Sequence, residues 1–389
     1  MSDPIVIIGA GQAAIKAIET LRHAGYDGRI VLAGDESYPP YQRPPLSKAY
    51  LSGEMEAARL FFKADDFYPS HNIELKLKTR ASRIDAGAHR VTFADGSTLP
   101  YRKLLLATGA RARSLPLPGA TSDGVVTLRG IADVDRIRAH LESARHLAVI
   151  GGGYIGLEVA AVARKRGLAV TVLEACERVM ARVVSPQVSD FFEALHRGHG
   201  IALRLGTSIA AIAGNGRATG VTLADGTTIP ADLVLIATGA QPNSELAAAA
   251  GLKVDDGILV DHAARTSAPD IHAAGDCSRF PSPRYGRAIR LESVQNAIDQ
   301  AKVAALAMLG EEPVYDPVPW FWSDQYDVKL QIAGLSDGYD RTTLERFSET
   351  SFAVSYYKGE RLIAVDAINA PRAHMLARRA LAGDGANNP

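Results

Sequence analysis

The stretch Leu147-Ala-Val-Ile-Gly151-Gly-Gly153-Tyr-Ile-Gly156-Leu-Glu158 joins an apolar strand to a helix through spaced glycines. In this spacing the turn needs the first glycine, a pyrophosphate can approach the backbone at the second, and helix and strand pack closely at the third. The next strand, Val170-Thr-Val-Leu173, ends in Glu174. A carboxylate there pairs with free ribose hydroxyls and repels a 2′-phosphate. The stretch therefore predicts a dinucleotide site that favours NADH over NADPH, although Arg178 follows closely.

A similar junction begins the chain, in Ile5-Val-Ile-Ile-Gly9-Ala-Gly11-Gln-Ala-Ala14, and a helical pattern follows from Ile15. Asp35 comes directly after the strand-like residues 30–33 and Gly34, where an acid accepts hydrogen bonds from an adenosine ribose. Glycine turns of this kind can also serve only to pack a helix, but strand, helix and acid together favour binding. Two dinucleotide sites in one chain predict a resident flavin and a mobile nicotinamide, and hence hydride transfer from NADH to FAD.

An internal repeat indicates that the two strand-to-helix junctions belong to two related domains. Residues 93–100 and 104–110 closely resemble residues 223–230 and 234–240, and each copy has Asp-Gly at a hairpin turn and a strand ending in Thr-Gly. Further expectations are a strand at 254–260, a helix at 292–309 and an antiparallel sheet after residue 317. The predicted fold class is α/β, with two Rossmann-like dinucleotide-binding domains, for FAD and NAD, and a C-terminal α+β domain.

Composition excludes several other classes of protein. The 389 residues contain 43 Lys plus Arg and 43 Asp plus Glu, so no charge excess indicates nucleic acid or a membrane surface. The two cysteines, Cys176 and Cys277, form neither a disulfide framework nor a metal-ligand cluster, and we expect both to be buried and inert. We expect no secretory leader, and no apolar run reaches the ~18 residues of a membrane span. These features predict a cytoplasmic protein without a metal.

Four segments together resemble one family over nearly the whole chain: Arg43-Pro-Pro-Leu-Ser-Lys48, the glycine stretch ending at Glu158, Ala274-Gly-Asp-Cys277 and Pro319-Trp-Phe-Trp-Ser-Asp-Gln325. They are similar to the oxygenase-coupled, FAD-dependent NADH:ferredoxin reductases of the pyridine nucleotide-disulfide oxidoreductase superfamily, which have the glutathione-reductase fold. The resemblance implies a discontinuous FAD domain (1–112 and 240–316), an inserted NAD domain (113–239) and a C-terminal domain over the flavin (317–389). It also implies a [2Fe–2S] ferredoxin partner and a monomer or weak homodimer. Family members usually continue past the point where the given sequence stops, at Pro389, so the resemblance assigns no family contact from that tail.

The resemblance also assigns site residues by motif match. For FAD they are Gly9, Gly11, Ala13, Ala14, Asp35, Arg43, Pro44, Lys48, Ala81, Arg129, Asp276, Val294 and Trp322. For NADH they are Gly151, Gly153, Tyr154, Ile155, Gly156, Glu158, Glu174, Arg182 and Gly239. The catalytic set is Lys48, Glu158 and Trp322.

Each of these roles has a plainer alternative. Lys48, after a helix N-cap at Ser47, would pair with Glu158 beside the flavin, or it is a surface lysine. Glu158 could instead be a first-turn acid that serves the helix dipole. Asp276 would grip the ribityl chain, or it caps a turn.

The aromatic residues are also open to two readings. Trp320 and Trp322 share one side of a strand, where we expect one of them in the core and Trp322 against the flavin. Tyr154 either gates the nicotinamide pocket or packs.

Two rival functions differ in testable ways. A disulfide reductase needs a cysteine pair in the segment that here reads Arg43 to Lys48, which contains none. A signalling flavoprotein like the distantly similar apoptosis-inducing factor would reduce acceptors slowly. An acidic ferredoxin would instead be steered by a basic rim. The candidates for that rim are Lys63, Lys302, Arg284, Arg287 and Arg290.

Overall fold

A computed structural model describes residues 3–383 and divides into two compact units. Unit 1 consists of Met1–Gln42, Ala57–Arg111 and Gln241–Pro319. Unit 2 consists of Arg43–Glu56, Ala112–Ala240 and Trp320–Pro389. The short strands β8 (Ala110–Ala112) and β17 (Ala240–Pro242) lie where the chain passes from one unit to the other.

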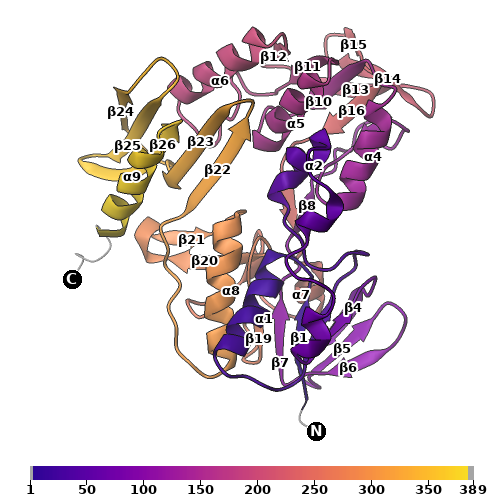
Figure 1. Cartoon of the computed structure of the whole chain (residues 1–389), viewed down its shortest axis with the longest axis vertical. Coiled ribbons are helices and arrows are strands. Elements are labelled where there is room, and N and C mark those ends of the chain that lie inside the picture. Colours follow the sequence, from indigo (N-terminus) through magenta and orange to yellow (C-terminus); the bar gives the residue numbers. More distant parts are fainter. Residues whose placement is uncertain (1–2, 384–389) are drawn as a thin grey trace. The chain divides into compact units, whose positions relative to one another are not determined.

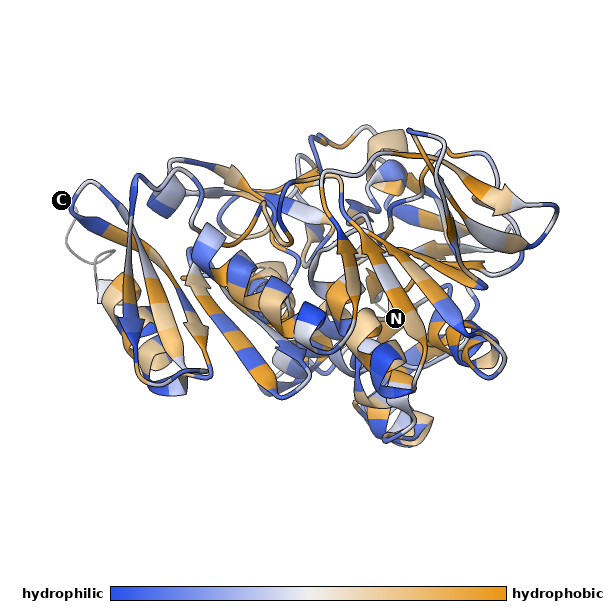
Figure 2. Cartoon of the chain, turned by 90° about the horizontal axis from the view of Figure 1, so that it is seen from above, coloured by the Kyte–Doolittle hydropathy of each residue, from blue (hydrophilic) through white to orange (hydrophobic). Residues whose placement is uncertain are grey.

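Unit 1 is built on a five-stranded parallel sheet in the order β19-β7-β1-β2-β3. Its strands are β1 (Ile5–Ile8), β2 (Ile30–Ala33), β3 (Ile73–Lys76), β7 (Lys103–Leu106) and β19 (Ile271–Ala273). The two helices α1 (Gln12–His23) and α8 (Val294–Met308) pack on each other, and both contribute to the core cluster with β1 and β2 (Figure 1). The strands are continuous apolar runs because parallel sheets are covered on both faces, and their ribbons are largely orange in Figure 2.

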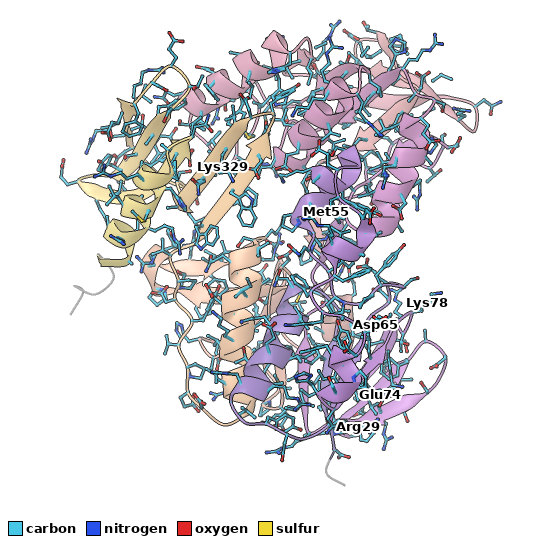
Figure 3. All side chains as sticks on the ribbon, in the orientation of Figure 1. Arg29, Met55, Asp65, Glu74, Lys78 and Lys329 are labelled. Atoms are coloured by element: carbon cyan, nitrogen blue, oxygen red, sulfur yellow. The ribbon has the colours of Figure 1, made fainter. Side chains whose placement is uncertain are left out.

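The smaller parts of unit 1 include one departure from expectation. A strand expected over 254–260 is limited to β18 (Ile258–Leu259), because Asp256 and Gly257 have φ of +45° and +128° and turn the backbone. Asp95-Gly96 forms the predicted hairpin turn between β5 and β6. At the edge strand β3, Glu74 forms ion pairs with Arg29 and Lys76. Figure 3 labels Glu74 and Arg29. The remaining elements are β4 (Ala81–Asp85), β5 (Arg90–Phe93), β6 (Thr98–Pro100), β20 (Ser278–Ser282), β21 (Arg287–Ile289), α3 (Phe67–Ser70), α7 (Glu245–Ala249), η2 (Ala57–Leu60) and η3 (Pro283–Tyr285).

Unit 2 repeats the parallel sheet in the order β12-β11-β10-β16-β9. Its strands are β9 (Val125–Val126), β10 (His146–Ile150), β11 (Ala169–Leu173), β12 (Ala202–Arg204) and β16 (Leu233–Ile236). The helices are α2 (Ala49–Ser52), α4 (Ile131–Leu141), α5 (Tyr154–Lys165) and α6 (Pro186–Gly198), with the short η1 (Pro44–Ser47). An antiparallel excursion contains β13 (Ile209–Gly214), β14 (Ala218–Leu223) and β15 (Thr228–Pro230).

The C-terminal part of unit 2 is the predicted antiparallel sheet, in the order β22-β23-β26-β25-β24. Its strands are β22 (Trp320–Gln325), β23 (Val328–Gly334), β24 (Arg341–Arg346), β25 (Phe352–Lys358) and β26 (Arg361–Ile368). Helix α9 (Pro371–Gly383) packs on β23 and β26. The predicted fold class is thus confirmed, while the three domain boundaries stay a prediction. Within residues 3–383, no helix combines the length and hydropathy needed to cross a membrane.

Candidate functional site

The β1–α1 junction of unit 1 has the geometry of a phosphate cradle. Gly9 has φ of +104°, and a Cβ there would lie 2.1 Å from the carbonyl oxygen of Ala107. A Cβ on Gly11 would meet no atom within 4 Å, and no described side chain caps α1 at this residue. The N–H groups of the first helical turn are therefore open to an anion, which the helix dipole attracts. These residues fit a dinucleotide pyrophosphate.

Asp276 lies close to this junction. It follows β19 through Gly275, where a Cβ would stand 3.3 Å from Cβ of Ala13 and 3.9 Å from Cβ of Ala297. The turn is held from α8, because the Gly275 N–H donates to Gln300 Oε1 at 2.9 Å. The first turns of α1 and α8 and the Asp276 segment thus converge at one end of the sheet.

Three further residues predicted for the FAD site belong to unit 1, namely Val294, Asp35 and Ala81. Ser293 caps α8 by accepting from the Asn296 N–H at 3.1 Å, which places Val294 at the first helical position. Asp35 is exposed beyond β2, the strand beside β1. Ala81 opens β4, in the separate antiparallel excursion.

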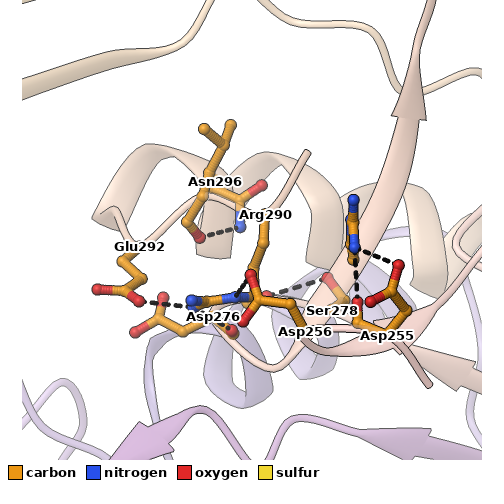
Figure 4. Close-up of polar contacts among 10 residues, drawn as sticks. Asp255, Asp256, Asp276, Ser278, Arg290, Glu292 and Asn296 are labelled. Atoms are coloured by element: carbon orange, nitrogen blue, oxygen red, sulfur yellow. Dashed lines mark hydrogen bonds and ion pairs between the residues drawn. The ribbon is translucent and has the colours of Figure 1, made fainter. Parts of the chain in front are cut away.

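Arg290 fixes the backbone around Asp276 (Figure 4). Its guanidinium forms ion pairs with Glu292 at 2.5 Å and with Asp256 at 3.3 Å, and it donates to the Asp276 carbonyl oxygen at 3.4 Å. Lys63 and Lys302 also form ion pairs, with Glu19 at 2.8 Å and with Asp299 at 3.3 Å. These three docking candidates are therefore engaged in contacts within the chain.

The β10–α5 junction of unit 2 repeats the cradle. Gly151 has φ of +107°, and its Cβ would lie 2.5 Å from the Ala237 carbonyl oxygen. Gly153 is open, and no described side chain caps α5 there. A Cβ on Gly156 would stand 2.2 Å from the Gly151 carbonyl oxygen, so helix and strand touch at this point. The N-terminus of α5 thus has the same open geometry, which also fits a pyrophosphate.

Glu174 borders the second cradle. Its Oε2 accepts from the Gly152 N–H at 2.6 Å and its Oε1 from the Cys176 N–H at 2.8 Å. Ile155 is 43% exposed on α5. Arg182 is exposed, with Nη2 3.8 Å from the position of a Cβ on Gly239. The structure therefore brings Glu174, Arg182 and Gly239 to the same end of this sheet as the open helix.

Lys48 and Glu158 form an ion pair, with Nζ 2.7 Å from Oε2. Glu158 lies on α5 and is only 4% exposed. Ser47 Oγ donates to the same Oε2, and Ser323 Oγ donates to Oε1 at 2.6 Å. The expectation that Ser47 caps a helix is wrong, because η1 ends there and α2 begins at Ala49, so its hydroxyl is used on Glu158 instead.

Arg43 and Pro44 shortly precede Lys48 in sequence, and Arg129 belongs to the same unit. Arg43 Nη1 donates to the Arg129 carbonyl oxygen at 2.7 Å, and Pro44 opens η1. Asp133 accepts from the Arg129 N–H at 2.9 Å and caps α4. These contacts fix the backbone of the segment that carries Lys48.

The aromatic residues of β22 form a half-exposed group. The rings of Trp320 and Trp322 stack with centroids 5.6 Å apart, so they share one face as predicted. Neither is fully buried, which contradicts the expectation of one core tryptophan, because β22 is an edge strand. On the opposite face of β22, the ring centroid of Phe321 lies 4.8 Å from the ring centroid of Tyr154. Burial raises the pKa of Tyr154, whose hydroxyl finds no partner among the described residues.

The cysteines differ from each other. Cys277 is buried, but Cys176 is exposed, so its expected burial is wrong. It lies in the loop after β11, and such loops run over the surface. In residues 3–383 no three His, Cys, Asp or Glu side chains gather as for a metal ion.

Ser47 and Ser323 were not predicted from the sequence to be hydrogen-bond partners of Glu158. The period of two in β22 contained a signal, because Ser323 and Gln325 are polar residues on the face opposite Trp322.

Comparison with known proteins gives consistent matches. Residues 3–301 match the family described as pyridine nucleotide-disulphide oxidoreductase, and residues 320–389 match the family described as reductase C-terminal. The chain is 47% identical to rhodocoxin reductase of Rhodococcus erythropolis over 381 residues, which cover 97% of this chain and 89% of that protein. It resembles a chain of the covalent putidaredoxin reductase–putidaredoxin complex with a TM-score of 0.94, 42% identity and coverage of 98% and 93%. The ferredoxin reductase for the CYP199A2 system of Rhodopseudomonas palustris matches with a TM-score of 0.94, 44% identity and coverage of 97% and 94%.

Proposed function

The chain belongs to the pyridine nucleotide-disulphide oxidoreductase family, and from this premise we propose that it is an FAD-containing reductase that takes hydride from NADH and passes single electrons to a [2Fe–2S] ferredoxin. The resemblance to oxygenase-coupled ferredoxin reductases is confirmed. At family level the chain is an NAD(P)H-dependent ferredoxin reductase of the kind that serves cytochrome P450 or ring-hydroxylating dioxygenase systems. Family membership implies binding of FAD and NAD(P)H.

One observation carries this proposal: each unit has an open helix N-terminus after a strained glycine. Gly11 and Gly153 both leave the first helical turn uncovered within the described residues. One pyrophosphate per unit accounts for both openings. A single-nucleotide enzyme would need only one of them.

NADH is favoured over NADPH by the surroundings of Glu174. Its carboxylate is fixed on the Gly152 N–H, where it would repel a 2′-phosphate. Arg178 is one nearby cation that could compensate, but its guanidinium is occupied. It donates to the carbonyl oxygens of Val184 at 2.7 Å and Ala181 at 2.8 Å, and to Ser189 Oγ at 2.7 Å.

The residues of unit 1 fit the binding of FAD. Gly9 and Gly11 would hold the pyrophosphate, Asp35 the adenosine ribose and Asp276 the ribityl chain. FAD, when bound, supplies the conversion of a two-electron hydride transfer into one-electron transfers. The dipole of α8 favours negative charge at its N-terminus, next to Val294.

Lys48 supplies a positive charge in unit 2, and Glu158 orients it. Such a charge favours the reduced form of a flavin. No cysteine stands between Arg43 and Lys48, so this segment has no dithiol that could relay electrons to a disulfide.

A ferredoxin that is acidic would be attracted by Lys302, which stays 46% exposed beside Asp299. Exposed ion pairs are weak and would yield to a stronger partner. Reversing the charge in Lys302→Glu should raise the KM for ferredoxin and weaken its salt dependence. An unchanged salt dependence would remove Lys302 from the docking surface.

The test is an anaerobic titration of the purified holoprotein with NADH and, separately, with NADPH. We expect the flavin spectrum to bleach readily with NADH and slowly with NADPH. Added [2Fe–2S] ferredoxin should then reoxidise it and reduce cytochrome c catalytically. A flavin that bleaches but is inert toward every ferredoxin would favour a signalling flavoprotein, and a protein without flavin would refute the proposal.

A further inference from the structure

The inner face of β22 carries two polar side chains that the proposed function has not used. Ser323 and Gln325 are both 0% exposed and alternate with Trp322 and Asp324 along the strand. A polar group buried this completely costs free energy unless it is hydrogen-bonded. Both side chains are bonded, and their partners form a continuous line that ends at Glu158.

The line has three hydrogen bonds in one direction. His196 Nε2 lies 2.8 Å from Gln325 Oε1, an amide oxygen that can only accept. Gln325 Nε2 donates to Ser323 Oγ at 3.2 Å, and Ser323 Oγ donates to Glu158 Oε1 at 2.6 Å. Every donor therefore points toward the Glu158 carboxylate.

His196 is the far end of this line. It lies on α6, is 0% exposed, and finds no partner for Nδ1 among the described residues. Its ring lies 5.4 Å from Tyr326, which in turn stacks on His199 at 3.6 Å. Burial lowers the pKa of His196. The neutral ring must carry its proton on Nε2 to donate to Gln325, so one tautomer is selected.

The two oxygens of Glu158 have separate partners. Oε2 accepts from Lys48 and Ser47, while Oε1 accepts from Ser323. Donors on both oxygens fix the plane of a carboxylate as well as its position. Without Ser323, Oε1 would be a buried acceptor without its donor, and the carboxylate could rotate away from Lys48.

From this arrangement we infer that Ser323, Gln325 and His196 are positioning residues, which hold the Glu158 carboxylate and through it the Lys48 ammonium in place for hydride transfer. The inference rests on the proposed function, in which the family resemblance assigns Lys48 to the catalytic set. None of the three residues needs to touch substrate or cofactor. Their effect is passed on through Glu158.

The main test is Ser323→Ala in the flavin-loaded protein, with Ser355→Ala as a matched control. Ser355 lies half-buried on β25 of the same sheet, outside the line. In anaerobic stopped-flow with NADH, S323A should lower the limiting rate of flavin bleaching about tenfold, the size expected for a hydrogen bond to a charged group. The NADH Kd and the flavin content should stay unchanged. S355A should match the wild type.

Two further measurements separate positioning from a merely structural role. Thermal unfolding of S323A, E158Q and the double variant should give non-additive losses in Tm, since one bond joins the two side chains. His196→Gln keeps a donor near the Nε2 position and should retain most of the rate, whereas His196→Leu should lose several-fold. If S323A does not fold, Ser323→Thr, which keeps a hydroxyl, replaces it and should bleach near the wild-type rate.

The outcomes are distinguishable. Wild-type protein that NADH does not bleach counts against the proposed function, while the Tm cycle still tests the bond. An S323A limiting rate equal to wild type, or additive Tm losses, would overturn the inference alone. A slow S323T protein, or an S355A protein as slow as S323A, would also overturn it.

Discussion

Gly9 in unit 1 and Gly151 in unit 2 each follow the central strand of a five-stranded parallel sheet, β1 and β10 respectively. Their φ angles are +104° and +107°, and a Cβ would meet a carbonyl oxygen of the neighbouring strand at 2.1 Å and 2.5 Å. The two junctions differ seven residues later, in the helix. Lys16 there is part-exposed and pairs with Glu19 at 3.2 Å, whereas Glu158 is buried and holds Lys48. Under the proposed function, the backbone of such a junction sets phosphate binding, and the second turn of its helix decides whether the unit also carries a catalytic ion pair.

The largest expected effect comes from Gly9→Ala and Gly151→Ala, which should separate the two sites. Each new Cβ meets a carbonyl oxygen, so G9A should lose FAD, and G151A should keep FAD but fail to bleach with NADH. Visible absorbance and NADH titration measure both. The controls are Gly25→Ala and Gly167→Ala, which also have positive φ but meet no atom within 4 Å. Loss of flavin in G151A would show that the sites depend on each other.

The next effect concerns the acids beside the junctions. Glu174→Gln keeps the shape but replaces an acceptor by a donor and removes the repulsion of a 2′-phosphate. The ratio of NADH to NADPH affinity should fall about tenfold, or roughly 1.4 kcal/mol. Asp35→Asn, the counterpart in unit 1, should weaken FAD retention and leave this ratio alone. An altered ratio in D35N would contradict the assignment of the two sites.

Substitutions at the third position of each glycine pattern, Ala14 and Gly156, should have a smaller effect, and this effect is on the stability of the protein. Gly156→Ala forces a Cβ to within 2.2 Å of the Gly151 carbonyl oxygen, which we expect to destabilise the protein by about 1–3 kcal/mol. Ala14 is already accommodated and fully buried in unit 1, so Ala14→Gly should cost about 1 kcal/mol from helix propensity. Thermal unfolding of both variants tests whether G156A loses more stability than A14G. A G156A protein more stable than A14G would show that α5 can shift where α1 cannot.

The smallest effect concerns how the stability of the protein changes with pH. A buried group in unit 2 should lower stability as pH rises, whereas a buried group in unit 1 should lower it as pH falls. Burial raises the pKa of Asp366 in unit 2 to about 7, against a hydrogen bond from Tyr356 that lowers it. Its contribution to stability is present at acid pH and is lost as pH rises through about 7. Burial, with the charges of Lys103 and Arg265, lowers the pKa of His272 in unit 1 to about 4. That contribution is present above the ordinary histidine pKa and is lost as pH falls toward 4.

Two variants test this difference. Asp366→Asn should raise Tm by on the order of 5 °C at pH 8 and change it little at pH 3.5, below the ordinary pKa of an aspartate. His272→Leu should instead flatten the fall in Tm below pH 6. A D366N gain that is equal at both pH values would show that Asp366 does not titrate in this range.

The elements that sequence predicts well here are those with strong local rules. The strands Ile5–Ile8 and Ile30–Ala33 are apolar runs that could only be buried, and both have the predicted bounds. The prediction of a strand at 254–260 was wrong because a turn with positive φ at Asp256 and Gly257 interrupts the flanking apolar residues. The hydroxyl bonds to Glu158 were not predictable, since they join residues 111 and 165 positions apart. Such contacts are decided by tertiary packing, which local periodicity does not encode.

The interleaving of the two units has a consequence for synthesis. Strand β1 leaves the ribosome before the other strands of its sheet, yet this sheet lacks β19 until residue 273 is made, and the helix partner α8 ends only at residue 308. Meanwhile the whole β10–α5 sheet of unit 2 has been translated. The second-made unit can therefore complete its parallel core first, and the nascent N-terminal strands must stay shielded until then. Rare codons or a chaperone contact between residues 60 and 270 should accordingly change yield more than the same change after residue 310.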